Sequence, residues 1–150
     1  MITKELEVNK KYITYASEYL LEKIFLPYIK ERIEDEKFVI FTEKNMEETL
    51  DTLLTKVNLE KIIKEKIKNI KWKNDDEKNI NKLQEYVKEN KHINVVISGE
   101  FDYIKKINNK IKDIKNTNVE IIDCFHIEDP NVNIEEIISN YRYILNTQKI

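Results

Sequence analysis

The chain has 150 residues, of which one is glycine and two are proline. That shortage excludes a phosphate-binding P-loop and a dinucleotide-binding fingerprint, because each needs at least about two or three glycines within a short loop. The charges nearly cancel, with 26 basic and 28 acidic side chains. Lysines are interspersed with glutamates, a pattern that indicates solvated helix surfaces rather than a nucleic-acid-binding stripe.

The single cysteine, Cys124, excludes an internal disulfide and a cysteine-rich metal framework. No apolar run approaches the roughly 18 residues of a membrane span. The amino-terminal residues include early acidic side chains and no hydrophobic signal region. We therefore expect one cytoplasmic domain over residues 1–150 that binds neither nucleic acid nor a membrane.

Short β-branched segments alternate along the chain with longer segments of helical spacing. The first kind predicts strands over residues 11–16, 37–42, 67–72, 93–97 and 119–125. Apolar residues three and four positions apart predict helices over 17–33, 45–66, 75–87, 100–114 and 133–145. Pro27 lies inside the first of these helices and is expected either to kink it or to begin a new one.

This alternation predicts an α/β fold: a single three-layer domain with about five mostly parallel strands and helices on both faces. Ligands of such sheets bind beyond the carboxyl ends of the strands. The segments that end there are residues 15–17, 42–43, 72–74, 98–100 and 124–129. We expect any functional residues to lie among them.

The densest group of reactive side chains follows the last strand. Cys124, His126 and Glu128 would share one face of an extended segment and are acceptable zinc or iron ligands. Alternate positions on one strand are about 6–7 Å apart, however, too far to close on one ion without bending. The alternative is a buried cysteine beside a hydrogen-bonded histidine. A Cys–His nucleophile is a further alternative, but no oxyanion site is evident.

Gly99 ends the best strand and directly precedes Glu100. A glycine there indicates a tight turn or a close approach of the backbone to a neighbour. Glu100 could contact a ligand, or it could lie at a helix N-terminus, where the macrodipole favours a carboxylate. Trp72, with three tyrosines, could line a pocket or pack in the core; the tyrosines are Tyr12, Tyr15 and Tyr103.

Four segments share a recognisable local pattern. Residues 12–15 form an aromatic strand, residues 25–41 begin with phenylalanine and hydrophobic residues and run through a charged turn into a strand, and residues 70–72 form a strand before a long helix. The fourth comprises residues 96–100, which end in Gly-Glu, and residues 122–125, which carry the cysteine. In this order the segments resemble the MEDS domain, a sensory domain named from methanogens and methylotrophs. Arg32 stands where the family usually has glycine.

The resemblance implies a RecA/KaiC-like fold whose nucleotide loop has degenerated, in a sensor of small molecules. Residues 16–23, where a P-loop would stand, contain no glycine, so ATP hydrolysis is not expected. We expect a non-catalytic sensory or regulatory domain without cofactor or metal, which signals through a protein partner or a homodimer. Its ligand-binding residues would be Trp72, Gly99, Glu100, Cys124 and His126. The alternative is a partner-binding scaffold or inhibitor that binds no ligand.

Overall fold

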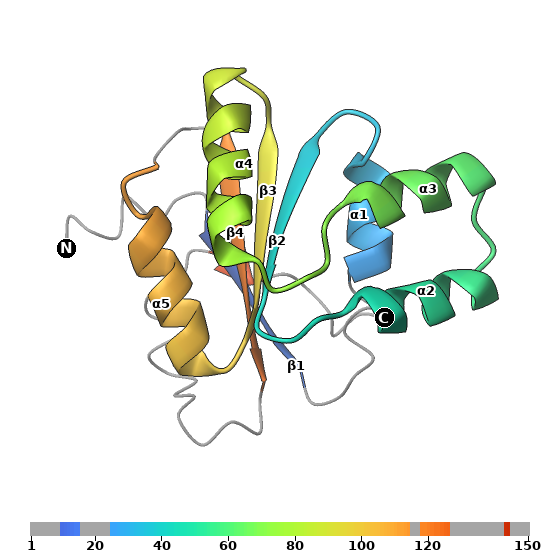
Figure 1. The fold of residues 1–150 in the computed structure, drawn as a ribbon, viewed down its shortest axis with the longest axis horizontal. Coiled ribbons are helices and arrows are strands. Elements are labelled where there is room, and N and C mark those ends of the chain that lie inside the picture. The colour runs from blue at the N-terminus through green and yellow to red at the C-terminus, as the bar shows by residue number, and fades with distance from the viewer. Residues whose placement is uncertain (1–9, 16–24, 115–117, 127–142, 145–150) are drawn as a thin grey trace.

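The computed structural model describes residues 10–15, 25–114, 118–126 and 143–144. Their strands form one parallel sheet in the order β2-β3-β4-β1-β5 (Figure 1). The strands are β1 Lys10–Tyr15, β2 Lys37–Thr42, β3 Ile93–Gly99, β4 Val119–His126 and β5 Tyr143–Ile144. The helices are α1 Leu26–Arg32, α2 Glu47–Lys56, α3 Lys61–Asn69, α4 Asp76–Lys88 and α5 Phe101–Ile111. The predicted α/β class is confirmed.

Helices cover both faces of the sheet, because β2 and β3 are apolar on both sides. On one face, α1, α2 and α3 pack on the sheet through the α1-face core, which comprises Phe25, Leu26, Tyr28, Ile29, Phe38, Ile40, Leu50, Leu54, Ile63, Ile67, Ile70, Trp72, Val96, Ile122 and Cys124. On the other face, α4 and α5 pack through the α5-face core, which comprises Val39, Phe41, Leu83, Ile93, Val95, Ile97, Tyr103, Ile104, Ile107, Ile111, Val119 and Phe125. Figure 1 shows α4 and α5 together on the near side of the sheet.

The strand predicted over residues 67–72 is wrong, because this segment ends a helix. α3 continues to Asn69, and Ile63, Ile67 and Ile70 all face the α1-face core at helical spacing. Trp72 then turns back on the helix, and its indole Nε1 donates a hydrogen bond to the Ile67 carbonyl at 2.9 Å. The β-branched isoleucines of this segment had indicated a strand. Together with the intervening lysines they form the end of an amphipathic helix.

The helix predicted over residues 45–66 is two helices. Val57 and Glu60 have extended backbones, with ψ angles of 151° and 145°, so α2 ends and α3 begins around them. The apolar residues Val57 and Leu59 are two positions apart, a step that no continuous helical face can accommodate. The break lets both helices direct their apolar faces to the α1-face core.

Two predictions at the ends of the chain lie partly outside the described residues. The helix predicted over 17–33 is described only from residue 25, and there α1 carries Pro27 in its first turn. The helix predicted over 133–145 is contradicted at Tyr143–Ile144, which pair in parallel with Lys11 and Tyr12 as β5. Residues 133–142 lie outside the described part.

Among the described strands β2 lies at an edge of the sheet, and a side chain from α4 covers part of that edge. Asn79 is 2% exposed, and its Nδ2 donates to the Ile40 carbonyl at 2.9 Å. That carbonyl would otherwise be buried without a partner in the described part of the chain, where β3 is the one strand paired with β2. α4 itself begins at an Asp75 cap, whose side chain accepts a hydrogen bond from the Lys78 amide.

Candidate functional site

Gly99, at the carboxyl end of β3, is required by a close approach and not by its backbone angles. No glycine of the described chain has a positive φ. A Cβ built on Gly99 would lie 2.8 Å from Glu43 Oε1 and 2.8 Å from Tyr103 Cδ2. Of the two explanations that the sequence offered, the close approach is therefore confirmed.

The Glu43 carboxylate fills the end of the sheet beside Gly99. Its Oε1 accepts a hydrogen bond from the Glu100 backbone N–H at 2.9 Å, next to the start of α5. The Glu43 backbone is held at both ends, since its N–H donates to the Ser98 carbonyl at 3.1 Å and its carbonyl accepts from Asn74 Nδ2 at 3.1 Å. The chain thus supplies its own anion at this helix N-terminus, where the backbone dipoles favour negative charge.

Tyr103 completes this end of the sheet. Its ring lies in the α5-face core, and its hydroxyl donates to Asp76 Oδ1 at 2.8 Å. Burial raises the pKa of the Tyr103 hydroxyl far above its usual value, and the hydrogen bond to Asp76 raises it further. The hydroxyl therefore stays protonated and links α5 to the start of α4. The carboxyl ends of β2 and β3 are occupied by the chain's own side chains.

The predicted ligand-binding residues do not meet at one point. Glu100 is exposed and caps α5 through its backbone only, without a side-chain cap hydrogen bond. Trp72 is 1% exposed in the α1-face core, so its indole serves packing and its N–H is already bonded. Cys124 lies on the same face of the sheet as Trp72, and Gly99 lies between Glu43 and Tyr103.

Cys124 is an inert core thiol in this fold. It is 0% exposed, and burial raises the pKa of the thiol well above its usual value, with a further increase from the charge of Asp123. A buried thiol of raised pKa is a poor nucleophile and a poor metal ligand. His126 ends β4 opposite Tyr15 of β1. The side chain of His126 and the whole of Glu128 lie outside the described part of the chain.

The strand order reverses between β4 and β1. After β1 the chain crosses to β2 at one edge through α1, whereas after β4 it reaches β5 on the far side of β1. Neighbouring strands whose connections leave in opposite directions leave a crevice between their carboxyl ends, where α/β proteins bind ligands. The bordering strand ends are Tyr15 and His126, which pair in the parallel register.

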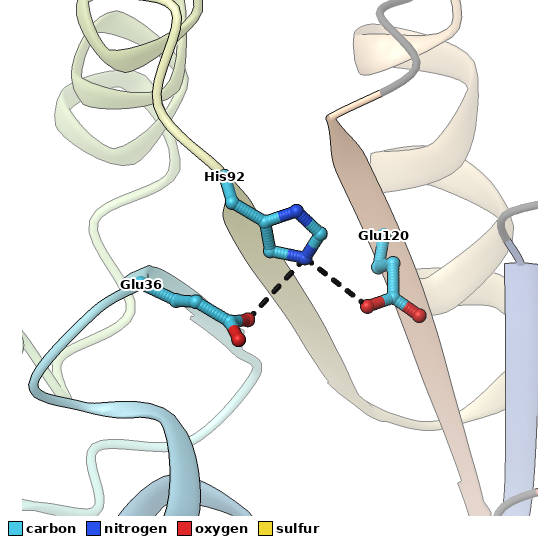
Figure 2. A group of neighbouring side chains, drawn as sticks. All are labelled: Glu36, His92 and Glu120. Atoms are coloured by element: carbon cyan, nitrogen blue, oxygen red, sulfur yellow. Dashed lines mark hydrogen bonds and ion pairs between the residues drawn. The ribbon is translucent and has the colours of Figure 1, made fainter.

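A second polar group lies at the opposite, amino edge of the sheet. Glu36 directly precedes β2, His92 directly precedes β3, and Glu120 is the second residue of β4. Figure 2 shows both carboxylates directed at the His92 ring: Nε2 lies 3.3 Å from Glu36 Oε1 and 3.2 Å from Glu120 Oε2. One ligand atom from each residue lies within 4.8 Å of the others, and all three side chains are partly exposed.

Buried polar side chains hold Glu36 in place. Asn94, which is 0% exposed, donates from Nδ2 to Glu36 Oε1 at 2.8 Å and accepts at Oδ1 from the Tyr28 hydroxyl at 2.9 Å. Burial raises the pKa of Tyr28, and the charge of Glu120 adds to the effect while Arg32 opposes it. The tyrosine therefore remains a donor, which fixes the direction of the whole chain of hydrogen bonds.

A simple signal in the sequence could have located this second group. Side chains alternate between faces along a strand, so Glu36, His92 and Glu120 continue rows that point into the α1-face core. The rows are Glu36-Phe38-Ile40, His92-Asn94-Val96 and Glu120-Ile122-Cys124. The rule that ligands bind at the carboxyl ends of strands does not lead to this amino edge, where each row becomes polar.

Comparison of the chain with protein-family models, with curated proteins and with solved structures finds no match. The resemblance to the MEDS domain therefore stays a prediction from short sequence segments. Among the helices of the described residues, none combines the length and the apolar character that crossing a membrane requires.

Proposed function

We propose that the protein is a non-catalytic sensory or regulatory domain that binds a small molecule at the carboxyl edge of its sheet, in the crevice between β4 and β1. The observation that carries the proposal is the reversal of strand order at this pair of strands. The β2 and β3 ends, by contrast, are occupied by Glu43 and Tyr103. The ligand therefore contacts the strand ends at Tyr15 and His126 rather than Trp72.

The RecA/KaiC-like fold is part of this proposal. An all-parallel sheet whose first strand lies inside the sheet, between β4 and β5, is compatible with it. The order differs from the 3-2-1-4-5-6 order of the dinucleotide-binding fold and from the 2-1-3-4-5 order of the flavodoxin-like fold. With one glycine in the chain, a small molecule other than a nucleotide triphosphate is the expected ligand.

Nuclear magnetic resonance on selectively labelled protein tests the site. Because Gly99 is the only glycine, ¹⁵N-glycine labelling gives one amide signal, which reports on the neighbour of Phe125 at the carboxyl edge. A small-molecule library would first be screened by thermal shift, since a ligand at 100 times its dissociation constant stabilises the fold by about 2.7 kcal/mol. A hit should move the Gly99 signal in the ¹⁵N-glycine sample. In a second sample labelled with ¹⁵N-histidine it should move the His126 signals and leave those of His92 unchanged.

The matched control for that experiment is a pair of variants at the two edges. His126→Asn should weaken binding of the hit, whereas His92→Asn, at the amino edge, should leave the affinity unchanged. Compounds that stabilise the protein but move only the His92 signal would contradict a ligand site at the carboxyl edge. A library that stabilises nothing would remove the support for a small-molecule sensor.

The second candidate is a partner-binding scaffold or inhibitor that binds no ligand, on the same degenerate ATPase-like fold. It is favoured by the occupied strand ends, because the side chains of Glu43, Asn74 and Tyr103 already form hydrogen bonds within the chain there. Its test is capture of one stoichiometric protein partner, or a homodimer in sedimentation, without added small molecule. Binding of that partner unchanged in His126→Asn, together with a silent ligand screen, would select this candidate over the sensor.

A further inference from the structure

We propose that Glu36, His92 and Glu120 form a binding site for a divalent transition-metal cation, with Zn²⁺ as the best-matched ion. Imidazole nitrogen and carboxylate oxygen are both common zinc ligands, and three protein ligands leave further coordination positions for water. The site lies at the amino edge of the sheet, so it is independent of the small-molecule site proposed at the carboxyl edge.

The distances suit a tetrahedral ion. Zinc–nitrogen and zinc–oxygen bonds of about 2.0–2.2 Å place neighbouring tetrahedral ligand atoms about 3.3–3.6 Å apart. Nε2 of His92 lies 3.3 Å from Glu36 Oε1 and 3.2 Å from Glu120 Oε2. The two carboxylate oxygens are within 4.8 Å of each other, which small side-chain rotations can reduce. No strand has to move for the three atoms to share one cation.

The charges of the group also favour the binding of a cation. Nε2 carries at most one N–H, which cannot point straight at both Glu36 and Glu120. The two carboxylates are near each other at a half-buried position, where like charges repel. A metal ion between the three groups accepts a lone pair from each and neutralises that repulsion.

The surroundings hold the ligands in place, as they do in established metal sites. Lys37 N–H donates to the His92 carbonyl at 2.9 Å, which ties the start of β2 to the start of β3. Asn94 orients the Glu36 carboxylate and is itself oriented by Tyr28. Such outer hydrogen bonds change metal affinity by about 10–100-fold when removed. With 40%, 25% and 20% of the side chains of His92, Glu36 and Glu120 exposed, an ion and its water ligands can reach the group.

Titration of the full chain with zinc chloride, after treatment with EDTA, tests the proposal. Isothermal calorimetry should give one zinc per chain, with affinity lowered at least about tenfold in His92→Asn and in Glu120→Gln. His126→Asn, which changes the only other histidine, should bind zinc as the wild type does. Magnesium should not compete, because it prefers all-oxygen ligands. Unchanged affinity in His92→Asn, or loss of binding in His126→Asn instead, would overturn the site.

A second measurement does not depend on the folding of variants. With only two histidines, ¹⁵N-histidine labelling gives two ring systems, and zinc should shift the Nε2 resonance of His92 alone. Tyr28→Phe, which keeps the ring but removes the donor to Asn94, should weaken zinc binding about tenfold through the orientation of Glu36. Saturation with zinc that leaves both Nε2 resonances in place would refute coordination by His92.

Discussion

Replacement of Gly99 by alanine tests whether the glycine is there to admit its neighbours. The added Cβ would lie 2.8 Å from both Glu43 Oε1 and Tyr103 Cδ2, and 3.0 Å from Glu43 Cβ. Since φ is not positive, the backbone itself tolerates alanine, and the whole cost is steric. The Glu43 carboxylate is the end of a flexible side chain and moves away, whereas the Tyr103 ring is packed in the α5-face core.

The expected loss of stability follows from these contacts. Displacement of Glu43 breaks its hydrogen bond to the Glu100 amide, which contributes only about 0.5–1.5 kcal/mol because both residues are exposed to water. Pressure on the Tyr103 ring adds an overpacking cost of about 1–3 kcal/mol. Lower entropy of the unfolded chain offsets about 0.4–1 kcal/mol of this loss. We expect Gly99→Ala to lower the free energy of unfolding by about 1–3 kcal/mol.

Urea unfolding followed by the fluorescence of Trp72, the only tryptophan, measures this change. The control is the same substitution in a Glu43→Ala background, where the carboxylate and its hydrogen bond are already absent and the contacts with Tyr103 and with the Cβ of residue 43 remain. There Gly99→Ala should cost at least about 0.5 kcal/mol less than in the wild-type chain, as a double-mutant cycle would show. A Gly99→Ala protein as stable as the wild type, or equal costs in both backgrounds, would refute the reasoning.

Three further outcomes follow from buried polar groups. The folded-state pKa values of Tyr28 and Tyr103 are raised, so their contribution to the free energy of unfolding is fully present below pH about 10. Above that pH the free energy of unfolding falls by up to ~1.4 kcal/mol per pH unit for each tyrosine, because the unfolded chain ionises first. In urea unfolding between pH 9 and 11, Tyr28→Phe should lose stability less steeply than the wild type, and equal slopes would contradict this. Asn79→Ala should cost about 1–3 kcal/mol by leaving the Ile40 carbonyl without its partner, and a cost under about 0.5 kcal/mol in urea unfolding would show that water replaces the amide. Cys124 should react with a thiol reagent only as fast as the chain opens, and rapid labelling of the native protein would disprove its burial.

The sequence predicts the sheet much better than it predicts the helices α2 and α3 packed on one of its faces. β2, β3 and β4 are found at the expected residues, because strands buried on both faces have continuous apolar character. The segment around Ile70 was wrongly predicted as a strand, because its isoleucines are β-branched, although their three-residue spacing is that of a helix. The break at Val57 depends on the tertiary packing of α2 and α3. No glycine or proline lies near Val57 to indicate the break in the sequence.

The candidate sites show the same division. The close approach at Gly99 could be anticipated from the rarity of glycine, but its neighbours Glu43 and Tyr103 come from other segments and need the fold to be identified. His92 and Glu120 are 28 residues apart, and only the parallel register of β3 and β4 brings them together. A local motif cannot encode such a group, whereas the alternation of faces along each strand can.

The Asn79 amide on the edge of β2 also limits how two copies of this chain could associate. A second strand that added to β2 would need the Ile40 carbonyl as an acceptor, and α4 has already taken it. Extension of the sheet across this edge into a second molecule would thus have to dislodge part of α4 together with Leu83, a residue of the α5-face core. A homodimer is therefore not expected to form through the β2 edge, which resists the strand-to-strand pairing from which fibrous aggregates grow.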